Sequence, residues 1–127
     1  MIIFRTKPFT RLARREGLTD DHICLAVQEM NSGLIDANLG SGLFKKRIAV
    51  PGKGKSGGWR TLIGFKTSEK AFFLYVFPKK SQDDIQRHEL IALKKLAKFY
   101  LSMKTWEIEA ALDRGELHKV DCDGKRQ

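Results

Sequence analysis

The middle of the chain carries three apolar segments whose side chains alternate with the period of two that is typical of β-strands. They cover residues 43–50, 59–65 and 71–77, and the third is apolar throughout, as expected for a strand covered on both faces. Only short connections separate the three segments. Consecutive strands with short connections pair as neighbours, so we predict a three-stranded antiparallel meander.

Apolar residues at helical spacing precede the meander. A short strand over residues 2–5 is followed by a basic helix over residues 9–15, with Pro8 suited to its first turn and Gly17 ending it. Thr19 is a favoured N-cap for a second helix. The apolar face of that helix is predicted at Ile23, Ala26, Val27 and Met30.

Helical spacing returns after the meander. A helix is predicted from residue 85 or 89 to about residue 103, with Ser81 as its N-cap and Asp83 and Asp84 at its positive end. A shorter helix over residues 106–112 follows, and Gly115 is expected to terminate it. Residues 117–120 are a candidate edge strand.

The element order β-α-α-β-β-β-α-α predicts an α+β fold in which helices pack on one face of a small antiparallel sheet. A chain of 127 residues is long enough to bury a core without staples. We therefore expect a single domain over residues 1–127, in which residues from about 121 to 127 form a polar, frayed tail.

Basic residues concentrate in the meander. The chain carries 24 Lys and Arg against 15 Asp and Glu, a formal net charge of +9. Residues 37–68 contain no acid, and their seven bases are Lys45, Lys46, Arg47, Lys53, Lys55, Arg60 and Lys66. Clustered bases displace counterions from a polyanion and steer its association. The charge therefore indicates nucleic acid as a partner, with an acidic protein as the alternative.

Several kinds of site are not indicated. Cys24 and Cys122 lie far apart without a CxxC or Cys/His cluster, so we expect neither a zinc site nor a disulfide, which suits a reducing cytoplasm. The glycine-rich segment 52–58 is expected to be a loop between two strands, and it lacks the GxxxxGK[ST] order of a nucleotide-binding P-loop. Neither a signal peptide nor a membrane span is expected, because no apolar run approaches about 20 residues. No metal or cofactor is expected.

Strand ends bring part of the basic charge together. In an antiparallel meander Arg60 begins one strand, and Lys79 and Lys80 end its neighbour. Lys53 and Lys55 of the glycine-rich segment fall at the same end of the sheet. A guanidinium and several ammonium groups at one place can bind a phosphodiester and stabilise the charge on its transition state. A plain basic binding surface, which needs only the charge, stays the alternative.

The aromatic residues of the strands allow two interpretations. Trp59 and Phe77 are candidates to stack on bases, with Lys45, Arg47 and Lys79 as neighbouring RNA contacts. Aromatic residues at strand spacing are also common in cores, and this interpretation is favoured for Phe77. The three histidines lie far apart in the sequence, which favours surface or capping roles over a catalytic pair: His22, His88 and His118.

Several segments together resemble toxins of the RelE/ParE superfamily, in the RelE/HigB-like branch of type II toxin–antitoxin systems. The segments are GKGKSGGWRT at 52–61, FFLYVFPKKS at 72–81, DI at 84–85, ELIALKKLA at 89–97 and AALDRGELHKV at 110–120. The KGKSGG-aromatic-Arg signature, followed by an aromatic strand that ends in Lys, is the most specific part. The resemblance covers most of the chain.

The resemblance implies a RelE-like microbial ribonuclease fold and a metal-independent, ribosome-dependent mRNA endonuclease (an mRNA interferase) that inhibits translation. The 2′-hydroxyl of the RNA would attack the adjacent phosphate and give a 2′,3′-cyclic phosphate. By motif position, Lys53 and Lys55 match loop lysines with base and charge-stabilising roles. Arg60 matches the strand arginine that holds the phosphate. Lys80 falls at the position of a general acid or electrostatic stabiliser, with Lys79 as its companion.

The sequence departs from the family pattern at Gln86, near which a base-stacking tyrosine would fall. Two alternative functions stay open: a ParE-like toxin that inhibits DNA gyrase, and a non-catalytic basic module that binds RNA or the ribosome. The lysine-rich segment favours the nuclease over the gyrase inhibitor. For either toxin the resemblance implies a cognate antitoxin, often a helix-turn-helix protein.

Overall fold

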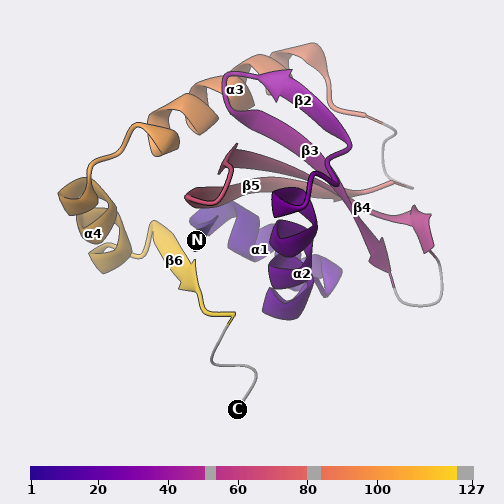
Figure 1. The fold of residues 1–127 in the computed structure, drawn as a ribbon, viewed down its shortest axis with the longest axis horizontal. Coiled ribbons are helices and arrows are strands. Elements are labelled where there is room, and N and C mark those ends of the chain that lie inside the picture. Colours follow the sequence, from indigo (N-terminus) through magenta and orange to yellow (C-terminus); the bar gives the residue numbers. More distant parts are fainter. Residues whose placement is uncertain (51–53, 80–83, 123–127) are drawn as a thin grey trace.

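The computed structural model describes residues 1–50, 54–79 and 84–122, which form a six-stranded sheet with four helices (Figure 1). The strand order is β2-β3-β4-β5-β1-β6. The strands are β1 (Ile2–Thr6), β2 (Ala37–Gly40), β3 (Leu43–Val50), β4 (Gly54–Lys66), β5 (Lys70–Pro78) and β6 (Leu117–Val120); the helices are α1 (Lys7–Glu16), α2 (Asp20–Asn31), α3 (Arg87–Leu101) and α4 (Thr105–Asp113). The α+β class is confirmed.

The predicted meander is present. Strand β3 pairs antiparallel with β4, and β4 with β5, so that Lys45 lies opposite Leu62 and Arg60 lies opposite Phe77. The sheet as a whole is mixed, because β1 pairs parallel with β5. Strand β1 is followed by two helices instead of a hairpin, which leaves it free to enter the sheet parallel to β5. The candidate edge strand is confirmed as β6, antiparallel to β1.

Helices cover both faces of the sheet, so the expectation that they pack on one face is wrong. Helices α1 and α2 pack on one face, where Phe9, Ile23 and Met30 join a core with Phe73 of β5. Helices α3 and α4 supply Leu93, Ala97 and Ala111 to a second core on the opposite face. The reason is β5, whose residues 71–74 are all buried and therefore need cover on both sides.

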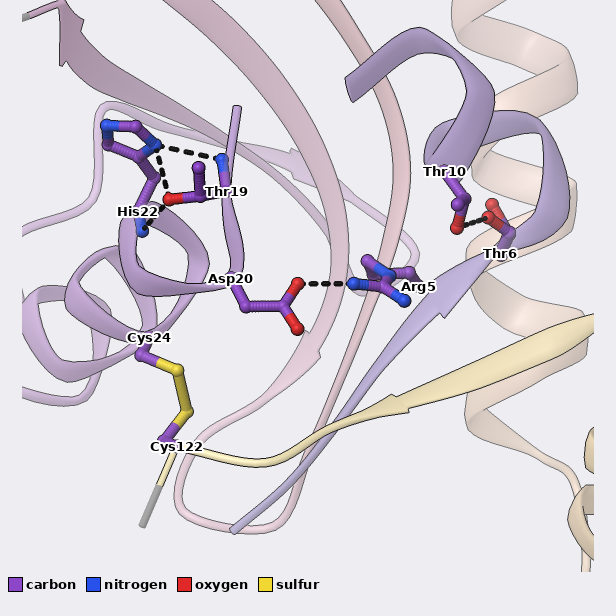
Figure 2. Close-up of polar contacts among 8 residues, drawn as sticks. All are labelled: Arg5, Thr6, Thr10, Thr19, Asp20, His22, Cys24 and Cys122. Carbon is purple, nitrogen blue, oxygen red and sulfur yellow. Dashed lines mark hydrogen bonds and ion pairs between the residues drawn. A yellow bond between two sulfur atoms is a disulfide. The ribbon is translucent and has the colours of Figure 1, made fainter. Parts of the chain in front are cut away.

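The two helices near the N-terminus begin and end at residues that are favoured as helix caps. Thr6 caps α1, and Gly17 ends it with a φ of 77°. Thr19 caps α2, where His22 Nδ1 accepts a hydrogen bond from the Thr19 backbone N–H at 2.9 Å (Figure 2). At the other end of the chain, α3 begins after Gln86, so the prediction of Ser81 as its cap is wrong; Ser81 itself lies outside the described residues.

A disulfide joins Cys24 of α2 to Cys122, two residues after β6, with their Cα atoms 5.7 Å apart (Figure 2). The expectation of two unpaired cysteines is therefore wrong. Spacing along the sequence could not predict this bond, because the two residues are 98 positions apart and meet only once the sheet has formed. Both cysteines pack against the α1–α2 core, and the bond anchors Cys122, which the sequence had placed in a frayed tail.

Reduction of this disulfide is expected to lower the free energy of unfolding by about 2–5 kcal/mol, because the bond closes a long loop in the unfolded chain. Urea titration with and without dithiothreitol measures the effect. The Cys24→Ser/Cys122→Ser double variant is the control and should unfold at the reduced protein's midpoint under both conditions. A wild-type midpoint that does not respond to the reductant would contradict the pairing.

Within the described residues, none of the helices has the length and apolar character needed to cross a bilayer.

Candidate nucleic-acid interface

Three bases come together on two neighbouring strands of the meander. Strand register places Arg47 of β3 opposite Arg60 of β4, and Lys45 lies two residues along β3. Residues directly opposite each other in an antiparallel pair share a face of the sheet. Arg60 also lies opposite Phe77, which belongs to the core under α3. We call Lys45, Arg47 and Arg60 the cationic face.

The members of the cationic face differ in exposure. Arg60 is 3% exposed, whereas the side chain of Lys45 is half-buried and that of Arg47 is exposed. The Arg47 guanidinium Nε lies 3.9 Å from an oxygen of Asp36. Because an arginine stays protonated when it is buried, Arg60 contributes a fixed positive charge beneath the two more accessible bases.

An acidic residue lies within this positive field. Lys45 Nζ is 3.5 Å from Asp84 Oδ1, just before α3. The pKa of Asp84 is lowered, chiefly by the hydrogen bond that its carboxylate accepts from the Ile85 backbone N–H at 2.8 Å. The charges of Lys45 and Arg60 lower the pKa further. The sequence placed Asp84 at a helix N-terminus and gave no sign of this contact across the sheet.

Tyr75 extends the same face of the sheet toward α3. It lies opposite Leu62, one row from the Arg60–Phe77 pair, and its ring centroid is 5.9 Å from that of Phe77. Burial raises the pKa of the Tyr75 phenol, and the neighbouring Glu89 carboxylate raises it further. Glu89 also accepts a hydrogen bond from the Gln86 backbone N–H at 3.1 Å. Tyr75 was missed because the apolar run 71–77 made every residue in it a candidate for the core.

Lys79, directly after β5, lies beside the glycine-rich part of β4. The Lys79 backbone N–H donates to the Gly58 carbonyl at 3.1 Å, so Lys79 lies next to the segment that leads into Arg60. Lys53 and Lys80 lie outside the described residues, as does the side chain of Lys55. The backbones of Arg60 and Lys79 therefore lie near each other on the paired strands, and their shared role in one site stays a prediction.

The glycine-rich segment is largely strand, which corrects its assignment as a loop. Strand β4 begins at Gly54, and Val50 pairs with Gly54 before the register resumes at Ile48 and Trp59. Gly58 lies against β3 so closely that a Cβ atom there would be 2.1 Å from the Ile48 carbonyl oxygen. Only glycine allows this approach of the two backbones.

Gly58→Ala is therefore expected to push β3 and β4 apart and to lower the free energy of unfolding by about 1–3 kcal/mol, as overpacking does. Urea denaturation followed by circular dichroism measures the loss. Amide chemical shifts of Ile48 and Lys79 should change as well, since Ile48 of β3 lies on one side of Gly58 and Lys79, directly after β5, lies on the other. A variant with the wild-type midpoint would contradict the close approach.

The interpretation of Trp59 and Phe77 as a stacking platform is corrected by their positions. The two residues are 6% and 3% exposed, and they belong to the cores on opposite faces of the sheet. Trp59 Nε1 donates to Glu16 Oε1 at 3.3 Å, and the ring meets His22 edge-on at 5.2 Å. Trp59 thus points away from Arg60, as alternation along β4 requires.

The remaining candidates do not form a catalytic cluster. His22 belongs to the cap of α2, and His88 is exposed on α3. His118 of β6 lies opposite Arg5 of β1. Among the described residues, no group of His, Cys, Asp and Glu could hold a metal ion.

A family model described as RelE toxin of the RelE/RelB toxin–antitoxin system matches residues 1–120. The chain belongs to the RelE toxin family. Membership identifies it as the toxin component of a toxin–antitoxin system and implies an antitoxin as its partner. No curated protein matches the chain.

Proposed function

We propose that this RelE-family toxin, of the HigB-like branch, is a cytoplasmic, ribosome-dependent mRNA endonuclease that inhibits translation. The observation that carries the proposal is the strand register that joins Lys45, Arg47 and Arg60 in one cationic face at the end where Lys79 closes the meander. A gyrase inhibitor has no need of such a phosphate-binding surface.

In the proposed reaction, the 2′-hydroxyl of the mRNA attacks the adjacent phosphorus, and the bond to the 5′-oxygen of the next nucleotide breaks. The products are a 2′,3′-cyclic phosphate and a 5′-hydroxyl. Negative charge grows on the phosphoryl oxygens in the transition state. Fixed cations that already point at that charge lower the barrier, because they need no reorganisation as it develops.

The lowered pKa of Asp84 indicates the positive electrostatic potential that a phosphate would meet at this position. Its pKa is lowered partly by Lys45 and Arg60, so an anion at this position is stabilised even by the buried arginine. The Asp84 side chain is 66% exposed and its contact with Lys45 is long. A surface pair of this kind contributes about 0–1 kcal/mol, so the Lys45 ammonium can exchange the carboxylate for a phosphodiester.

The proton-transfer roles are assigned by the family resemblance. Lys53 and Lys55 are proposed as base and charge-stabilising groups, and Lys80 as general acid or stabiliser with Lys79 beside it. A lysine crowded by other cations has a depressed pKa and can act in acid–base chemistry near neutral pH. No metal is assigned a role.

Lys45→Ala/Arg47→Ala is expected to reduce mRNA cleavage on the order of 100-fold, because hydrogen bonds to charged groups contribute about 1.5–3 kcal/mol each. In a plot of the logarithm of the RNA-binding constant against the logarithm of the salt concentration, the slope should also become shallower by about 1.4, because two phosphate contacts are lost. Primer extension on mRNA in a translation extract measures cleavage. The matched control is Lys66→Ala/Lys119→Ala, which removes two exposed bases elsewhere and should leave cleavage unchanged.

Arg60→Gln removes the buried charge and keeps a polar side chain. Cleavage is expected to fall about 10²–10³-fold, because the fixed charge beneath the phosphate is lost, while circular dichroism stays unchanged. Wild-type cleavage by this variant and by the Lys45→Ala/Arg47→Ala variant would disprove the assignment of the site. Intact mRNA together with gyrase-dependent DNA breaks would replace the proposal with gyrase inhibition.

A further inference from the structure

The outer face of α3 carries exposed apolar side chains that no part of the described chain covers. Phe99 is 57% exposed, Ile91 is 49% exposed, and Leu96 is also exposed beside them. Ile91, Lys95, Lys98 and Phe99 follow the spacing i, i+4, i+7 and i+8, which places them on one side of the helix. We call Ile91, Lys95, Leu96, Lys98 and Phe99 the outer patch.

We propose that the outer patch docks an acidic, apolar segment of the antitoxin. This inference goes beyond the proposed reaction and rests on the toxin role that the proposed function includes. It depends on family membership and on the surface of α3, and not on which bond the toxin cleaves.

Phe99 has the features of an anchor for a protein partner. Its ring meets the ring of Tyr100 edge-on at 5.3 Å, and Tyr100 stacks on Phe72 of β5 at 5.2 Å. Phe99 therefore stands on a rigid part of the helix that is fixed to the sheet. A partner that covers this ring loses little side-chain entropy in the toxin, and buried aromatic residues commonly dominate protein interfaces.

Charge decides which protein partner fits. Lys95 and Lys98 lie among the apolar residues of the patch, and Glu89, the one acid of α3, is half-buried near Tyr75 and the helix N-terminus. Two copies of the patch would bring lysines against lysines, which disfavours a homodimer through this face. An acidic segment with apolar side chains complements both the charge and the exposed carbon surface.

The apolar side chains also favour protein over RNA. A phenyl ring can stack on a base, but Ile91 and Leu96 offer no planar surface for stacking and gain most from contact with other apolar side chains. The helix has 15 residues and is roughly 22 Å long, enough for a partner helix of three to four turns.

The position of α3 connects the outer patch to the cationic face. Its inner side packs on the meander through Leu93 and Ala97, and Ala97 lies against Gly64 of β4. Its N-terminal turn adjoins Tyr75 through Glu89, close after Asp84. A partner segment that follows α3 toward its N-terminus reaches the edge of the cationic face. Docking at the patch would thereby place acidic residues where they compete with RNA.

The test uses the purified full-length toxin and the protein encoded by the gene adjacent to it, which is expected to be the antitoxin. Ile91→Ser/Phe99→Ser should weaken binding at least about 30-fold in calorimetric titration, since interface anchors contribute about 2 kcal/mol or more. Lys95→Glu/Lys98→Glu should weaken binding and reduce its salt dependence. Leu25→Ser/Leu34→Ser, which changes two equally exposed apolar residues outside α3, is the control and should bind as wild type.

Binding unaffected by both patch variants overturns the proposal, as does an adjacent gene product that does not bind wild-type toxin. Normal antitoxin binding with lost ribosome binding also overturns it and assigns the patch to the ribosome. The titration contains neither ribosome nor mRNA. A toxin that does not cleave mRNA can therefore still bind the antitoxin in this titration. A loss of antitoxin binding, in turn, does not argue against mRNA cleavage.

Discussion

The register between β3, β4 and β5 is the constraint on which the site depends. At Gly58 the carbonyl accepts from Lys79 on one side, and the absence of a side chain admits the Ile48 carbonyl on the other. A slip of one residue would turn Arg60 toward α1 and α2 and bring Trp59 into its place. The glycines of this segment therefore act first on strand pairing, and the position of the cations follows from that pairing.

The alternation of side chains along β3 places Lys45 and Arg47 on one face of the sheet and Lys46 on the other. Lys45 contacts Asp84 on the α3 side, whereas Lys46 points toward α2, where its Nζ lies 2.7 Å from Glu29 Oε1 and donates to the Leu34 carbonyl at 2.9 Å. Lys46 is buried, so it cannot belong to a binding surface that the sequence alone counted as seven bases. A buried pair of this kind adds little net stability but penalises any register that would separate its partners.

Alternation, short connections and helical spacing were sufficient to predict the meander, the helices and the nearness of Arg60 and Lys79 on paired strands. Those features depend on neighbours in the sequence or on one pairing rule. The Cys24–Cys122 disulfide and the contact of Asp84 with Lys45 depend on elements that meet only in the folded sheet. The two interpretations of Trp59 could not be separated for a related reason: alternation assigns residues to two faces of the sheet, but the helices that cover those faces decide which face is open.

The burial of Arg60 limits how the cationic face can act. A guanidinium that is 3% exposed cannot offer its full fork to a phosphate, whereas Lys45 and Arg47 can reach one directly. Arg60 is therefore best suited to supply potential from below, and it lowers the pKa of Asp84 in the same direction as Ile85 and Lys45 do. An acidic antitoxin segment arriving along α3 would meet the same potential. Under the two proposals, RNA and the inhibitor would share the attraction of the cationic face, Lys95 and Lys98 would add to the attraction for the inhibitor, and the apolar outer patch would distinguish the protein from the nucleic acid.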